Sequence, residues 1–141
     1  MTEQDVTDIN WTAAFIGFGV DWVFSELVGY VVMMIMLVLK GIGLDSDADL
    51  PTDVLLARQI VGVVGAVLGG IVAGYLARRR GALHGVLGSV IGLFTILCTI
   101  PLLGGLGLTI GDLGFVVLNL VGAGYGGGMG ERWRARREGA E

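Results

Sequence analysis

The sequence predicts an all-α integral membrane protein with four transmembrane helices arranged as two hairpins. Of its 141 residues, 54% are hydrophobic and only 16% are charged, whereas soluble domains are about 45–50% apolar. The charged residues also cluster, so that Leu27–Leu39, Ile60–Ala77, Ala82–Leu103 and Leu113–Met129 contain no Asp, Glu, Lys or Arg. A helix needs about 20 mostly apolar residues to cross a bilayer. Three of these segments approach or reach that length, and the first does so when extended back to Trp11.

The first predicted helix covers Trp11–Leu39, with Asn10 as its N-cap. At 1.5 Å per residue it is about 43 Å long, which exceeds the ~30 Å hydrocarbon core of a bilayer. It must therefore tilt, project from the membrane or begin as an interfacial segment. Residues 1–10 are expected to form a cytoplasmic tail, and the acidic segment Gly41–Asp53 is expected to form a loop.

The second and third predicted helices cover 54–77 and 82–103. Arg78–Arg80 leave room only for a tight turn between them. Pro101 lies near the end of the third helix, where it frees one backbone carbonyl that a neighbouring threonine is expected to satisfy.

The fourth predicted helix covers 110–128, and 129–141 are expected to form a second cytoplasmic tail. A weak internal repeat relates this helix to the second one: IVAGY (Ile71–Tyr75) is echoed by VGAGY (Val121–Tyr125). Two hairpins of the same orientation would then be related by an axis along the membrane normal.

The 26 glycines are the strongest indication of how these helices pack. Lipid tails are as apolar as leucine, so membrane helices associate where small residues let their backbones approach. A phosphate-binding loop instead needs glycines between a strand and a helix, so we expect no nucleotide and no cofactor. The small residues predicted to pack form stripes on the second and third helices, which either close against each other or serve a homo-oligomer. Their glycines are Gly62, Gly65, Gly69, Gly70, Gly81, Gly85, Gly88 and Gly92.

The basic residues predict the orientation, because cytoplasmic loops are enriched in Lys and Arg. The opposite side has only Lys40 and Arg58. We expect both termini in the cytoplasm and the basic residues near anionic lipid headgroups, which accounts for the basic tail without nucleic acid. The residues that predict this are Arg78, Arg79, Arg80, Arg132, Arg134, Arg136 and Arg137.

Four polar residues within the predicted helices form a candidate intramembrane site: Asp21, Glu26, His84 and Asn119. A charge at mid-bilayer costs at least about 2.5 kcal/mol on insertion scales, so these residues indicate either a proton or cation path or neutral, hydrogen-bonded groups near an interface. In the second interpretation His84 only caps or packs at the turn. A single histidine without further ligands at suitable spacing does not make a metal site. No catalytic motif is present, so we expect no enzyme.

The partner of Asp21 depends on how deep the first helix sits. If the membrane begins at Trp11, Asp21 is level with Asn119; if Lys40 marks the opposite edge, Asp21 is level with His84. The sequence leaves both arrangements open.

Three stretches carry a family resemblance: NWTAAFIGF, GGIVAGYLARRRGALHGVLGSVIG and the glycine-rich end of the fourth helix. They resemble a family of small haloarchaeal membrane proteins classed as a domain of unknown function, which shows an NW-x-A start, an AGY-like end to helix two and a G-x-x-HG start to helix three. The resemblance covers Asn10–Gly130. Asp21, Glu26 and the long acidic first loop depart from it. It implies a haloarchaeal four-helix membrane protein and supplies no catalytic residue, and the Asp-rich, Lys-poor composition is consistent with such a source.

The expected function is that of a non-enzymatic cell-membrane protein, a structural or accessory subunit of a homo-oligomer or larger complex. Its expected partners are membrane lipids and a second copy or another membrane protein, with no nucleic acid. One alternative is a small oligomeric proton or cation channel or transporter that uses Asp21, Glu26 and His84. A further alternative is a membrane protein of a haloarchaeal virus or vesicle.

Overall fold

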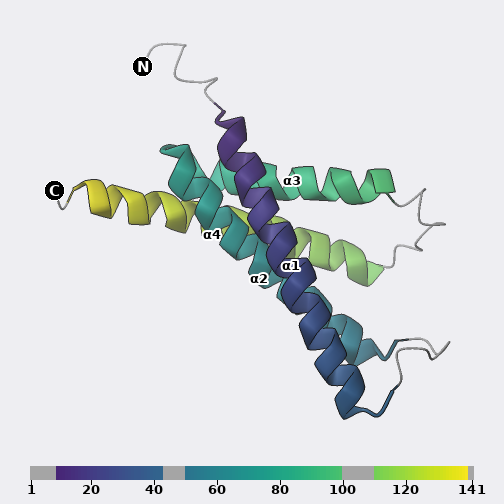
Figure 1. Ribbon diagram of the computed structural model, residues 1–141. Helices are drawn as coiled ribbons and strands as arrows, with labels where there is room; N and C mark the ends of the chain where they lie inside the picture. The colour runs from purple at the N-terminus through teal and green to yellow at the C-terminus, as the bar shows by residue number, and fades with distance from the viewer. Residues whose placement is uncertain (1–8, 43–49, 100–109, 140–141) are drawn as a thin grey trace.

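The computed structural model describes residues 9–42, 50–99 and 110–139, which form four helices and no strand in these ranges (Figure 1). All four helices are long and apolar enough to cross a membrane. The predicted all-α, four-helix membrane fold is therefore confirmed. The helices are α1 (Trp11–Leu39), α2 (Thr52–Ala77), α3 (Gly81–Thr99) and α4 (Ile110–Glu138).

Helix α1 has the predicted bounds, and Asn10 is its N-cap: the Asn10 side-chain oxygen accepts a hydrogen bond from the backbone nitrogen of Ala13 at 3.1 Å. Such a bond satisfies one of the free amides of a first helical turn. After α1 the chain turns through Gly41, whose φ of +67° is accessible to glycine without a Cβ penalty. An ion pair of 2.9 Å between Lys40 and Asp53 joins the end of α1 to the start of α2.

Helix α2 begins at Thr52, slightly before the predicted start, and ends at Ala77 as predicted. The turn that follows holds Arg78 and Arg80 at φ of 66° and 55°. This left-handed conformation costs an L-residue roughly 1–2 kcal/mol. The predicted end of the third helix, including Pro101, lies outside the described residues.

Helix α4 continues to Glu138, well past its predicted end at Gly128. Most of the segment MGERWRARRE consists of good helix formers, and Arg134 pairs with Glu138 one turn later at 2.6 Å. The part of the chain that the sequence assigns to a polar tail is therefore helical as far as Glu138.

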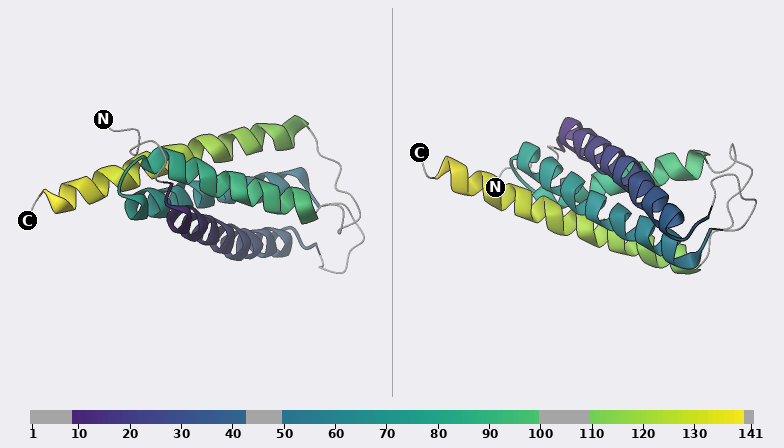
Figure 2. Two further views of the ribbon diagram at one scale, coloured as in Figure 1. Left: turned by 90° about the horizontal axis from the view of Figure 1, so that it is seen from above. Right: turned by 60° about the horizontal axis from the view of Figure 1, so that its bottom comes forward.

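The two hairpins, α1–α2 and α3–α4, cross each other obliquely (Figure 1). Helix α2 is central: it contacts the other three helices and lies between α1 and α4 (Figure 2). Within the described residues α1 and α4 make no contact, whereas α2 and α3 do.

The internal repeat predicts a twofold axis that exchanges α1 with α3 and α2 with α4. Such an axis would make the α1–α4 pair equivalent to the α2–α3 pair, so the observed arrangement departs from exact symmetry.

Helices α2 and α4 run in the same direction and cross with their backbones in direct contact. A Cβ atom at Gly70 would overlap the carbonyl oxygen of Ala123, and one at Gly74 would overlap that of Gly127. Small residues four apart on both helices thus form the kind of close interface that membrane helices use.

The predicted packing glycines divide between several partners, and the stripes of α2 and α3 meet each other where a Cβ at Gly85 would lie 3.3 Å from the Cα of Gly70. On α2, Gly65 and Gly69 face α1, while the neighbouring Gly70 faces α4. On α3, Gly81 and Gly85 face α4, whereas Gly88 and Gly92 face α1. Gly62 differs from the others, because nothing lies within 4 Å of the position its Cβ would take.

Candidate functional site

A groove with a mainly apolar surface, here called the polar groove after the polar side chains in its lining, lies between the two hairpins. It encloses about 540 Å³ and is lined by side chains of all four helices. Its walls also include apolar residues such as Phe18, Trp22 and Leu120. The polar lining consists of Asp21, Ser25 and Glu26 from α1, Arg58 from α2, Ser89 and Thr95 from α3, and Asn119 from α4.

Asp21 lies at the seam between α1 and α2, where two glycines of α2 make room for it. Ser25, one turn further along α1, donates its hydroxyl to Oδ1 of Asp21 at 3.0 Å. A Cβ at Gly65 would overlap the Ser25 hydroxyl, and one at Gly69 would come within 2.8 Å of the Asp21 Cβ. Gly65 and Gly69 therefore admit a polar pair to a seam that larger residues would close.

Glu26 and Arg58 form an ion pair at the edge of the groove. Nη2 of Arg58 lies 3.5 Å from Oε2 of Glu26, and the two side chains remain 49% and 58% exposed. The stem of Arg58 runs over Gly29 of α1, which has no side chain to obstruct it. The chain itself thus leaves about half of both side chains uncovered.

The α3 and α4 side of the groove offers hydroxyl and amide groups. Ser89 and Asn119 both line it. Thr95 donates its hydroxyl to the carbonyl oxygen of Ile91 at 2.9 Å and is therefore satisfied within its own helix. With Asp21, Glu26 and Arg58 ionised, the described lining carries a formal net charge of one negative unit.

His84 is not among the described residues that line the groove. It is almost fully buried, with 1% exposure, at the start of α3. Its Nε2 accepts a hydrogen bond from the backbone nitrogen of Asn10 at 2.9 Å, and its Nδ1 lies 3.0 Å from the carbonyl oxygen of Arg80. Because Nε2 is an acceptor, the proton belongs on Nδ1, which donates to that carbonyl.

These contacts show which residues lie beside the first helix. His84 is level with Asn10, and Asp21 lies further along α1, in the groove that Asn119 also lines. Of the candidate intramembrane site, the structure brings together Asp21, Glu26 and Asn119 and places His84 elsewhere.

A second polar cluster lies at the end of the bundle that holds the Arg78–Arg80 turn and the C-terminus of α4, here called the basic end. The carboxylate of Glu131 accepts hydrogen bonds from the backbone nitrogens of Gly81 at 2.7 Å and Arg80 at 3.2 Å. A carboxylate at a helix N-terminus satisfies free amides and interacts favourably with the helix dipole. Glu131 therefore caps α3 from another helix.

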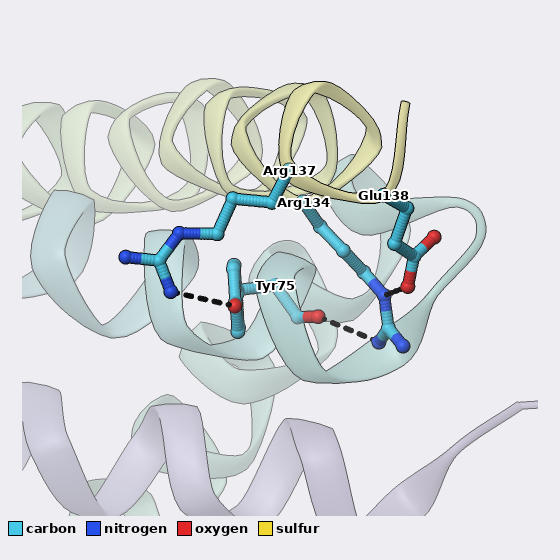
Figure 3. A network of polar contacts seen from close by, with 4 residues as sticks. All are labelled: Tyr75, Arg134, Arg137 and Glu138. Carbon is cyan, nitrogen blue, oxygen red and sulfur yellow. Dashed lines mark hydrogen bonds and ion pairs between the residues drawn. The ribbon is translucent and has the colours of Figure 1, made fainter. Parts of the chain in front are cut away.

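Arg134 of α4 caps α2 in the same region, and Arg137 contacts the side chain of the same tyrosine (Figure 3). Arg134 donates to the backbone carbonyl oxygen of Tyr75 at 3.0 Å and to Glu138 at 2.6 Å, and Arg137 lies 3.5 Å from the Tyr75 hydroxyl. The last carbonyls of a helix lack partners in that helix, so Arg134 supplies one. These roles were not predicted from the sequence, although acidic and basic residues three and four apart along α4 are typical of a helix that continues.

The other arginines that predict the orientation of the chain are exposed at the basic end. They are Arg78, Arg79, Arg80, Arg132 and Arg136. In the described ranges no three His, Cys, Asp or Glu side chains gather closely enough to hold a metal ion. No family model, curated protein or solved structure matches the chain.

Proposed function

We propose that the chain is a non-enzymatic subunit of a membrane assembly, in which a homo-oligomer or a larger complex covers the polar groove. The observation that carries this proposal is the exposure of Glu26 and Arg58, 58% and 49%, within helices apolar enough to span a membrane. A charged group that faces the hydrocarbon of a bilayer costs free energy, about 2.5 kcal/mol or more at the centre of a spanning helix. A partner surface that removes both groups from lipid is therefore favoured.

The basic end supports a cytoplasmic location for both termini. All the arginines except Arg58 lie in the Arg78–Arg80 turn or the last turns of α4, whereas Lys40 lies at the other end. The positive-inside rule then orients the basic end toward the cytoplasm. The Asp-rich, Lys-poor composition supports a halophilic source. A reporter fused after Glu141 should be active only on the cytoplasmic side, and extracytoplasmic activity would refute the orientation.

The assembly is tested by extracting the chain from its membrane into lipid nanodiscs without detergent and measuring the mass of the particle. We expect two or more copies, or one copy with another membrane protein. A particle that holds a single copy and lipid alone, at every protein density tested, would overturn the proposal.

A second candidate function is a proton or cation pathway through the groove. It is favoured by the position of Asp21, a carboxyl group at membrane depth that lines the same groove as Asn119. This version uses Asp21 and Glu26 without His84, whose ring nitrogens are bonded to Asn10 and Arg80.

Proteoliposomes separate the two functions. A pathway predicts a proton or cation flux that D21N abolishes while the fold is retained. The absence of flux with the unmodified chain would rule the pathway out and leave the subunit function standing.

A further inference from the structure

We propose that two copies of the chain join through reciprocal ion pairs, with Glu26 of each protomer against Arg58 of the partner subunit at the mouth of the polar groove. This inference rests on the proposed function, because it names a second copy as the partner that covers the groove.

The pair within one protomer leaves most of its bonding capacity unused. A strong charge-assisted hydrogen bond between nitrogen and oxygen measures about 2.7–2.9 Å, whereas Arg58 and Glu26 are 3.5 Å apart. A guanidinium carries five N–H donors and a carboxylate accepts at about four positions. With 49% and 58% of these side chains exposed, part of each side chain is accessible to a partner.

The geometry of the pair suits a symmetric dimer. Copies inserted with the same topology are related by an axis along the membrane normal, and rotation about that axis preserves the depth of every atom. Because the charged atoms of Glu26 and Arg58 are 3.5 Å apart, they lie at nearly the same depth. A twofold axis beside them brings each group opposite its counterpart in the other copy, so that four charges alternate around the axis.

The charges of the groove also select this partner. Asp21, the other charged residue among the described lining residues, already accepts a hydrogen bond from Ser25 at the seam. An anionic group alone would satisfy Arg58 and repel Glu26, and a cation would do the opposite. A second copy presents both signs at the required depth.

Charge exchange tests this arrangement with the full chain. The variants E26R and R58E each place like charges together, so we expect each one alone to dimerise about tenfold more weakly or worse. When the two variants are co-expressed with different affinity tags, the mixed dimer pairs two arginines of one copy with two carboxylates of the other. We expect the tags to co-purify in nanodiscs at the level of the unmodified chain. Each variant still repels itself internally, so an ion pair within one protomer does not explain this rescue.

Two further variant sets serve as controls. The double variant E26R/R58E restores opposite charges everywhere and should dimerise as the unmodified chain does, which shows that the exchanged side chains are compatible with the fold. The Lys40–Asp53 pair, at 2.9 Å, joins two helices of one chain. K40D and D53K should therefore leave the dimer unchanged, alone or mixed.

Single variants that dimerise like the unmodified chain would overturn the inference. So would a mixture that fails to recover while E26R/R58E dimerises, since the pair then acts only within one protomer. In both cases the chain remains an oligomer and the proposed function stands. An unmodified chain that is monomeric, with only lipid in the groove, would refute both proposals.

Discussion

Nε2 of His84 accepts a hydrogen bond from the backbone nitrogen of Asn10 at 2.9 Å, which joins the start of α1 to the first turn of α3. Asn10 is the N-cap of α1, and its amide has no partner within that helix. The only histidine of the chain thus links the two hairpins and fixes their relative level. Consequently Asp21 lies in the groove and not beside the Arg78–Arg80 turn.

Replacing His84 with alanine should lower the free energy of unfolding by about 1–2 kcal/mol, because the Asn10 amide loses its acceptor and a fully buried side chain is removed, whereas the Arg80 carbonyl keeps the backbone amide of residue 84. H84Q retains an acceptor near the position of Nε2 and should lose less. Unfolding in mixed micelles, followed by circular dichroism, measures the difference. Faster amide exchange at Asn10–Ala14 in H84A would show that the lost stability comes from the start of α1. Equal stability of H84A and the unmodified chain would show that the hydrogen bond between His84 and Asn10 contributes nothing.

Removing the Glu131 carboxylate should destabilise the start of α3 by about 1–2 kcal/mol, since Gly81 and Arg80 lose their acceptor at a helix N-terminus. Glu138 provides a matched control on the same helix, because it pairs with Arg134 but is exposed. E138A should cost about 0.5 kcal/mol or less. The same unfolding assay compares the two variants, and a loss in E138A as large as that in E131A would contradict the capping role.

Features encoded by neighbouring residues were predictable from the sequence. The Asn10 cap, the full extent of α1 and the end of α2 at Ala77 each depend on the local chain. The division of the α2 glycines between α1 and α4 does not depend on the local chain, because it is set by which helix packs on each side. Gly69 and Gly70 are only 100° apart around the helix, so they read as one small-residue face, yet α1 covers the first and α4 the second.

The candidate site was predictable only in part, for a related reason. A first helix of about 43 Å is longer than the bilayer core, so composition leaves its depth open, and the partner of Asp21 depends on that depth. The contact of His84 with Asn10 shows instead that Asp21 lies away from His84, in the groove that Asn119 also lines. The pairing of Glu26 with Arg58 was missed because Arg58 lies near the start of α2, and only its course over Gly29 brings it to Glu26.

Adjacent glycines of α4 should respond oppositely to alanine. A Cβ at Gly127 would overlap the carbonyl oxygen of Gly81, whereas nothing lies within 4 Å of one at Gly128. G127A forces α3 and α4 apart and should cost about 1–3 kcal/mol. G128A should be neutral or should stabilise the helix by about 0.5–1 kcal/mol. Thermal unfolding in the same detergent compares them, and equal losses would mean that α4 does not pack through Gly127.

The turn at Arg78 should become more stable with glycine. Its φ of 66° is left-handed, a conformation that costs an L-residue roughly 1–2 kcal/mol and glycine almost nothing. R78G and R78A remove the same charge and the same side chain, but only R78G removes the backbone penalty. We therefore expect R78G to exceed R78A in unfolding free energy by about 1 kcal/mol, measured in the same micelles. The result that would contradict this is an R78A variant at least as stable as R78G, because the turn would then not hold residue 78 in the left-handed region.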